Sequence, residues 1–135
     1  MITAIHEQWS LYDQHKPTKA CILYSTKVDK KVVNSNKILF LNRLKNYEQH
    51  HPGRMSVTLF ITGDYEKLDD SEEFPWHFTR RLTEADILTV LGGFSKRQQT
   101  VCYVCGPPSM TDELVHFLRS LDGLEASRVL CEKWW

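Results

Sequence analysis

The sequence has no excess of charge of either sign, because its 135 residues include 17 lysines and arginines and 17 aspartates and glutamates. This balance does not indicate nucleic acid or a membrane surface as the main partner. No apolar run approaches the ~20 residues that a helix needs to span a bilayer. The first residues form neither a basic segment nor the apolar core of a secretion signal. We therefore expect an intracellular protein without a membrane span.

Cysteine is scarce, with four residues: Cys21, Cys102, Cys105 and Cys131. The spacing of Cys102 and Cys105 is typical of zinc or redox sites. However, residues three apart on an extended strand point to opposite faces, and no second pair of this kind exists. The sequence therefore favours reduced thiols and no metal. The alternative, a zinc or thioredoxin-like protein, predicts a bound metal or a disulfide.

Short apolar runs alternate with helical patterns along the chain, which predicts an α/β domain with a parallel sheet and helices on both faces. Four segments are expected to be strands: Ala20–Tyr24, Met55–Thr62, Val101–Cys105 and Arg128–Glu132. The alternation in Met55–Thr62 predicts an edge strand with one wetter face. The acidic and aromatic stretch 63–79 is expected to be a solvated loop, held to the core by its aromatic residues.

Helical spacing predicts helices over residues 2–14 and Asn36–Glu48, the second with Phe40 facing inward. Thr83 and Asp86 have the spacing of a capping box, so a short helix is expected to follow and to end at Leu91. A further helix with an apolar stripe is expected after residue 108, with Ser109 or Thr111 as its cap.

The run from Val101 to Cys105 stops at Gly106, Pro107 and Pro108, and a helix pattern follows at once. Glycine lets a backbone approach a ligand closely, and proline fixes the loop. The free N–H groups of the following helix offer a site for phosphate. A tight turn without a ligand is the alternative that this motif alone leaves open.

The stretch Cys-Gly-Pro-Pro-Ser-Met at 105–110, together with the C-terminal Glu-Lys-Trp-Trp at 132–135, resembles the pyridine-nucleotide domain of the ferredoxin–NADP reductase superfamily. The resemblance implies a three-layer α/β sandwich with a parallel sheet. The family's Gly-rich first strand, at the centre of the sheet, and its flavin-binding barrel domain are missing from this sequence. We therefore expect residues 1–135 to form a single, N-terminally truncated NAD(P)-binding domain. Either the strands that flank the gap pair directly, or the fragment has low stability alone.

The resemblance also implies roles for individual residues. Cys105 and Glu132 are the candidate catalytic residues, next to the nicotinamide ring. Further candidate cofactor-binding residues follow the strand or close the chain: Gly106, Pro107, Pro108, Ser109, Met110, Trp134 and Trp135. The adenosine end is expected at Tyr24, Ser25, Thr26, Lys27 and Asp64.

The function implied is hydride transfer from NAD(P)H to a flavin. NADH is favoured over NADPH, because Asp64 would repel a 2′-phosphate and neither adenosine segment contains an arginine. FAD is expected to bind mainly to the missing domain, and a small redox protein is a possible electron acceptor. A mitochondrial location follows from the resemblance alone. The alternative function is a non-catalytic, truncated module that binds nucleotide weakly or serves in interactions.

Overall fold

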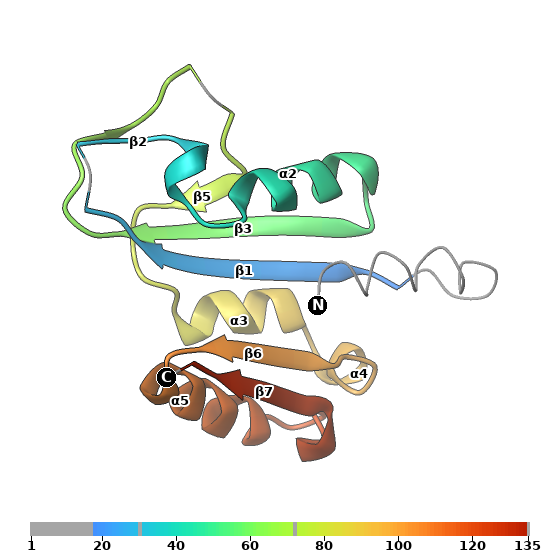
Figure 1. Ribbon diagram of the computed structural model, residues 1–135. Helices are drawn as coiled ribbons and strands as arrows, with labels where there is room; N and C mark the ends of the chain where they lie inside the picture. Colours follow the sequence, from blue (N-terminus) through green and yellow to red (C-terminus); the bar gives the residue numbers. More distant parts are fainter. Residues whose placement is uncertain (1–17, 30, 72, 135) are drawn as a thin grey trace. The chain divides into compact units, whose positions relative to one another are not determined.

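The computed structural model describes residues 18–134 except 30 and 72. The helix expected over residues 2–14 lies outside the described residues. The chain divides into two compact units, Met1–Leu82 and Thr83–Trp135. Both contain helices and parallel strands, so the predicted α/β class with parallel pairing is confirmed (Figure 1).

The sheet of the first unit has three parallel strands in the order β1-β3-β5. They are β1 (Ala20–Lys27), β3 (Met55–Thr62) and β5 (Trp76–Phe78). The prediction that Met55–Thr62 is an edge strand was therefore wrong. The reason is that Phe60, on the face expected to be wet, is buried and stacks on Phe78 with ring centroids 5.3 Å apart.

Helix α2 (Leu41–His50) covers the other face of this sheet, along β3 (Figure 1). Leu44 packs there against Met55 and Val57, and Leu41 packs against Leu59. Burial of these alternating strand residues against one helical stripe removes apolar surface from water, which is the main force that holds the unit together.

The prediction that a helix begins at Asn36 was wrong, because the α-helix begins five residues later. A short 3-10 helix, η1 (Ser35–Lys37), is followed by Phe40, which has a left-handed backbone with φ of 62°. Helix α2 begins only after it, at Leu41, and the Phe40 side chain is 58% exposed instead of facing inward. A positive φ is uncommon for an aromatic residue, and nothing in helical spacing indicates it.

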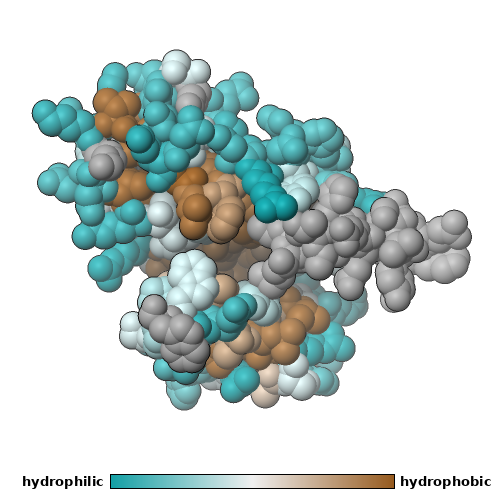
Figure 2. All heavy atoms as spheres, in the orientation of Figure 1, coloured by the Kyte–Doolittle hydropathy of each residue, from teal (hydrophilic) through white to brown (hydrophobic). Residues whose placement is uncertain are grey.

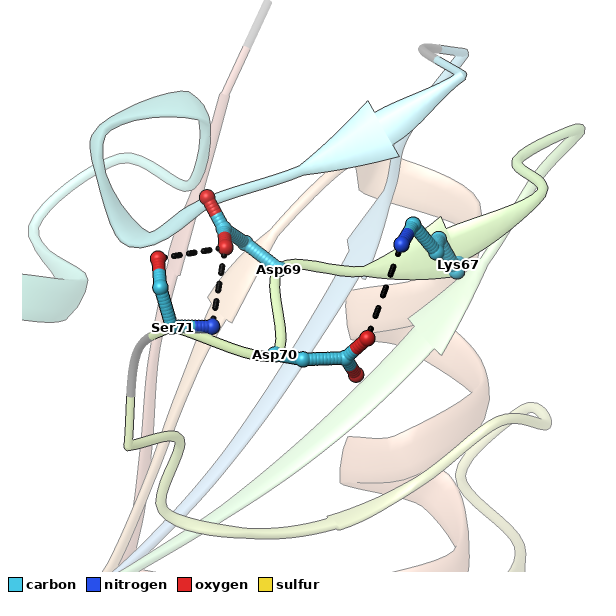
Figure 3. A network of polar contacts seen from close by, with 4 residues as sticks. All are labelled: Lys67, Asp69, Asp70 and Ser71. Carbon is cyan, nitrogen blue, oxygen red and sulfur yellow. Dashed lines mark hydrogen bonds and ion pairs between the residues drawn. The ribbon is translucent and has the colours of Figure 1, made fainter.

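The acidic stretch after β3 contains β4 (Lys67–Leu68), which pairs in parallel with β2 (Val32–Val33), a strand that precedes α2. Beyond β4, an Asp69 oxygen accepts hydrogen bonds from the Ser71 hydroxyl at 2.6 Å and its N–H at 3.0 Å (Figure 3). The Ser71 hydroxyl and N–H lower the pKa of Asp69. Lys67 Nζ forms an ion pair with Asp70 Oδ2 at 3.5 Å. The expectation that 63–79 is a loop was therefore wrong in part: it contains the short strands β4 and β5, which pair with strands distant in sequence, and only the turn at 69–71 is ordered by its own polar groups.

The second unit contains three α-helices, a 3-10 helix and a parallel strand pair: α3 (Glu84–Leu91), α4 (Phe94–Arg97), β6 (Cys102–Gly106), α5 (Pro108–Arg119), η2 (Ala126–Arg128) and β7 (Val129–Lys133). The predicted capping box is confirmed, since Thr83 and Asp86 exchange side-chain and backbone hydrogen bonds at the start of α3. β1 belongs to the sheet of the first unit, and β6 to the strand pair of the second.

Candidate functional site

The loop between β6 and α5 is set by its two prolines. Pro107 occupies the N-cap position and Pro108 the first helical position, where a missing N–H costs nothing. The helix thus starts earlier than a cap at Ser109 or Thr111 would place it. Because the first N–H groups of a helix have no partner within it, those of Ser109 and Met110 remain available to an acceptor.

Gly106 is the last residue of β6 and the point where three segments meet. Its carbonyl accepts hydrogen bonds from the buried Thr111 hydroxyl at 3.1 Å and from the Trp134 N–H at 2.9 Å. A Cβ added to Gly106 would overlap the Met110 methyl group. A larger residue here would therefore force the end of the Met110 side chain to move, and contact of Gly106 with a ligand stays a prediction.

The two candidate catalytic residues lie side by side. In the β6–β7 register Cys105 is paired with Glu132, and Gly106 with Lys133. Side chains alternate along a strand, so Tyr103 and Cys105 share the face opposite Val104, which is buried on the side of α5. Cys105 and Glu132, which are 27 positions apart in the sequence, are thus paired in the strand register and lie at the same end of one strand pair.

Tyr103 is a site residue that the sequence did not indicate. Its hydroxyl donates a hydrogen bond of 2.6 Å to Glu132 Oε2. This hydrogen bond, with smaller contributions from desolvation and nearby charge, raises the pKa of Tyr103 to about 12. The available signal was the two-residue spacing from Cys105, which places both side chains on one face. The strand register, which the sequence does not reveal, was needed to bring Glu132 to the same place.

The C-terminal tail is fixed to the same loop. Lys133 pairs with Asp112 of α5 at 2.6 Å, and this ion pair raises the pKa of the lysine. The side chain of Trp134 is 53% exposed although its backbone is anchored to Gly106. Figure 2 shows residues coloured as hydrophobic (brown) at the surface of the second unit. Trp135 lies outside the described residues.

The residues proposed for the adenosine end belong to the first unit. Ser25, Thr26 and Lys27 form the carboxyl end of β1, and Lys27 is paired with Thr62, two positions before Asp64. Asp64 is exposed. The carboxyl ends of two parallel strands therefore present these groups together, which is where open α/β sheets bind ligands.

Tyr24 has a different environment from its neighbours on β1. It packs on the core beneath α2, and its hydroxyl donates a hydrogen bond of 2.8 Å to the Leu39 carbonyl. Burial raises the pKa of Tyr24. Its part in nucleotide binding stays a prediction.

The four cysteines are free thiols, and burial raises the pKa of Cys102. Within the part of the chain that the structure describes, no group of three or more metal-ligating side chains is found. No helix in that part has the length and apolar character required to cross a membrane.

The amino-acid sequence is similar to those of several known proteins. The chain is a homologue of proteins named oxidoreductase NAD-binding domain-containing protein 1. It is 28% identical over 102 residues to the protein of Xenopus laevis, covering 76% of this chain and 30% of the relative. It is 25% identical over 122 residues to that of Danio rerio, covering 90% and 41% respectively. The human protein is 26% identical over 104 residues, covering 76% and 30%.

The chain thus spans between 30% and 41% of the length of these three relatives. Their shared name states that they contain an oxidoreductase NAD-binding domain. No family model matches the chain. No solved structure matches it either.

Proposed function

We propose that this chain is the nicotinamide-nucleotide-binding module of a flavin-dependent oxidoreductase, which passes hydride from NAD(P)H to flavin. The observation that carries the proposal is the pairing of Cys105 with Glu132 beside the glycine-proline loop that opens α5. It joins a thiol, a carboxylate and unpaired helix N–H groups at the carboxyl edge of one strand pair. The names of the homologous relatives support the same class of cofactor.

The residues present suit a nicotinamide nucleotide. The N–H groups of Ser109 and Met110 can donate to a phosphate, with which the positive end of the helix dipole also interacts favourably. Glu132 can accept a hydrogen bond from the carboxamide of the nicotinamide ring. When bound, the nucleotide supplies the hydride, and the protein supplies position and a shaped site. The role of Cys105 is to border the ring, and that of Trp134 is to cover the flavin.

We further propose that the adenosine end binds at Ser25–Lys27 and Asp64, with NADH preferred. Asp64 can accept from ribose hydroxyls and would repel a 2′-phosphate, although Lys27 could pair with one. FAD is assigned to a flavin domain outside this chain, and the electron acceptor to a small redox protein. The mitochondrial location is a proposal from the resemblance alone.

The test is calorimetric titration of the purified chain with NADH, NADPH and FAD. Saturable binding of NADH, weakened in Cys105→Ala but not in Cys131→Ala, supports the proposal. Cys131 is a matched control, because it lies on the neighbouring strand, paired with Val104 on the side of α5. No saturable binding of either nucleotide would refute it.

The second candidate function is a module that binds nucleotide without catalysis. It is favoured by the small share of the relatives' length that the chain covers, between 30% and 41%. NADH-dependent dye reduction after addition of FAD separates the two candidates. Binding without dye reduction supports the second one.

A further inference from the structure

We propose that Tyr103 is a positioning residue, which holds the Glu132 carboxylate in the orientation that receives the nicotinamide carboxamide. The inference rests on the proposed function and adds a residue to its site. It is carried by the hydrogen bond of 2.6 Å between the Tyr103 hydroxyl and Glu132 Oε2.

The strand register explains why this bond fixes a direction. Tyr103 is paired with Leu130, and Cys105 with Glu132, so the phenol reaches diagonally from β6 to a carboxylate that lies level with the thiol. Diagonal neighbours on one face of a sheet lie within reach of an aromatic side chain. The tyrosine therefore draws one carboxylate oxygen back along the strands, away from the loop at Gly106.

The second carboxylate oxygen then remains for a ligand. Within the described residues the Glu132 carboxylate has no other hydrogen bond, and the residue is exposed. A carboxylate can only accept, and the amide nitrogen of a nicotinamide can only donate, so the two groups are complementary. An exposed glutamate without a partner has several rotamers, and fixing it in advance lowers the entropic cost of binding.

Tyr103 is not itself a candidate for contact with the reacting atoms. Its phenol lies two residues before Cys105, on the far side of the carboxylate from the loop. Its ring is also distinct from the core of the unit, since the side chain is 40% exposed. Replacement by phenylalanine therefore removes the hydroxyl alone and leaves the ring in place.

The experiment compares NADH with ADP-ribose, which lacks the nicotinamide ring, in calorimetric titrations of the whole chain. For Tyr103→Phe we expect NADH affinity to fall by about threefold to tenfold, the effect of one lost hydrogen bond. We expect ADP-ribose affinity to stay unchanged. The matched control Tyr47→Phe removes a phenol hydroxyl from α2 and should change neither affinity.

A double-mutant cycle with Glu132→Gln completes the test. If Tyr103 acts through the carboxylate, its substitution in the Glu132→Gln background should have a smaller effect on NADH than in the wild type. Equal losses for NADH and ADP-ribose, no loss, or full additivity would overturn the inference while the proposed function stands. If the wild-type chain binds neither nucleotide, the proposed function fails and the inference fails with it.

Discussion

Substitution of Gly106 by alanine tests the packing of the candidate loop. The new Cβ would overlap the Met110 methyl group, while Met110 Sδ at 3.7 Å and Thr111 Oγ1 at 3.9 Å lie at ordinary contact distance. Insertion of one methyl group into a packed site costs about 1–3 kcal/mol. The overlapping atom is the end of a flexible side chain, so we expect Gly106→Ala to lower the free energy of unfolding by about 1–1.5 kcal/mol, near the lower end of that range.

The assay is urea unfolding of the wild type, Gly106→Ala, Met110→Ala and the double variant, with the midpoint and slope compared. The double variant should be more stable than the sum of the single effects predicts, because the smaller residue 110 makes room for the methyl group. The matched control is Gly93→Ala. A Cβ at Gly93 meets nothing within 4 Å, and its φ of −77° suits alanine.

The free energy of unfolding of the Gly93→Ala control should stay close to that of the wild type. Alanine restricts the unfolded chain more than glycine does, and this gain opposes the lower preference for alanine at the N-cap of α4. The reasoning is refuted if Gly106→Ala is as harmless as Gly93→Ala. It is also refuted if the effects of the substitutions at 106 and 110 are additive, because the added methyl group would then not meet Met110.

Three further predictions concern other parts of the second unit. Thr83→Ala should lower the free energy of unfolding by about 1 kcal/mol, the value of an N-cap, and an unchanged urea midpoint would contradict it. Ultraviolet titration of the phenolates should show that Tyr103 ionises near pH 12. Because the pKa of Tyr103 is higher in the folded than in the unfolded chain, its hydrogen bond stabilises the fold below pH ~10, and this contribution is lost as the pH rises toward 12. In Glu132→Gln that late step should move toward the ordinary range, and its persistence would argue against the hydrogen bond. A double-mutant cycle on Lys133 and Asp112 should give a small favourable coupling that shrinks in high salt. A coupling that salt does not change would show that the pair is not chiefly ionic.

The parts of the fold that the sequence predicted are those governed by local chemistry. Thr83 and Asp86 cap a helix through groups three residues apart, and the apolar run at 101–105 supplies β6, which begins one residue later than predicted and ends at Gly106. These features need no knowledge of distant contacts. The same holds for the amphipathic pattern of α5.

The features that sequence reasoning missed depend on distant contacts or on a rare backbone state. The left-handed Phe40 interrupts a helical pattern that is otherwise continuous. The middle position of β3 depends on Phe78, which comes 16 residues after the strand ends at Thr62 and supplies the cover of Phe60. The contact of Tyr103 with Glu132 spans 29 residues and follows only from the strand register.

The most direct test of the candidate site is its location by NMR. Amide chemical shifts of the labelled chain would be followed while NAD is added. We predict the largest changes at Cys105, Gly106, Ser109 and Met110 of the β6–α5 loop and at Glu132 of β7. Changes confined to other parts of the chain, or none at saturating nucleotide, would contradict the account.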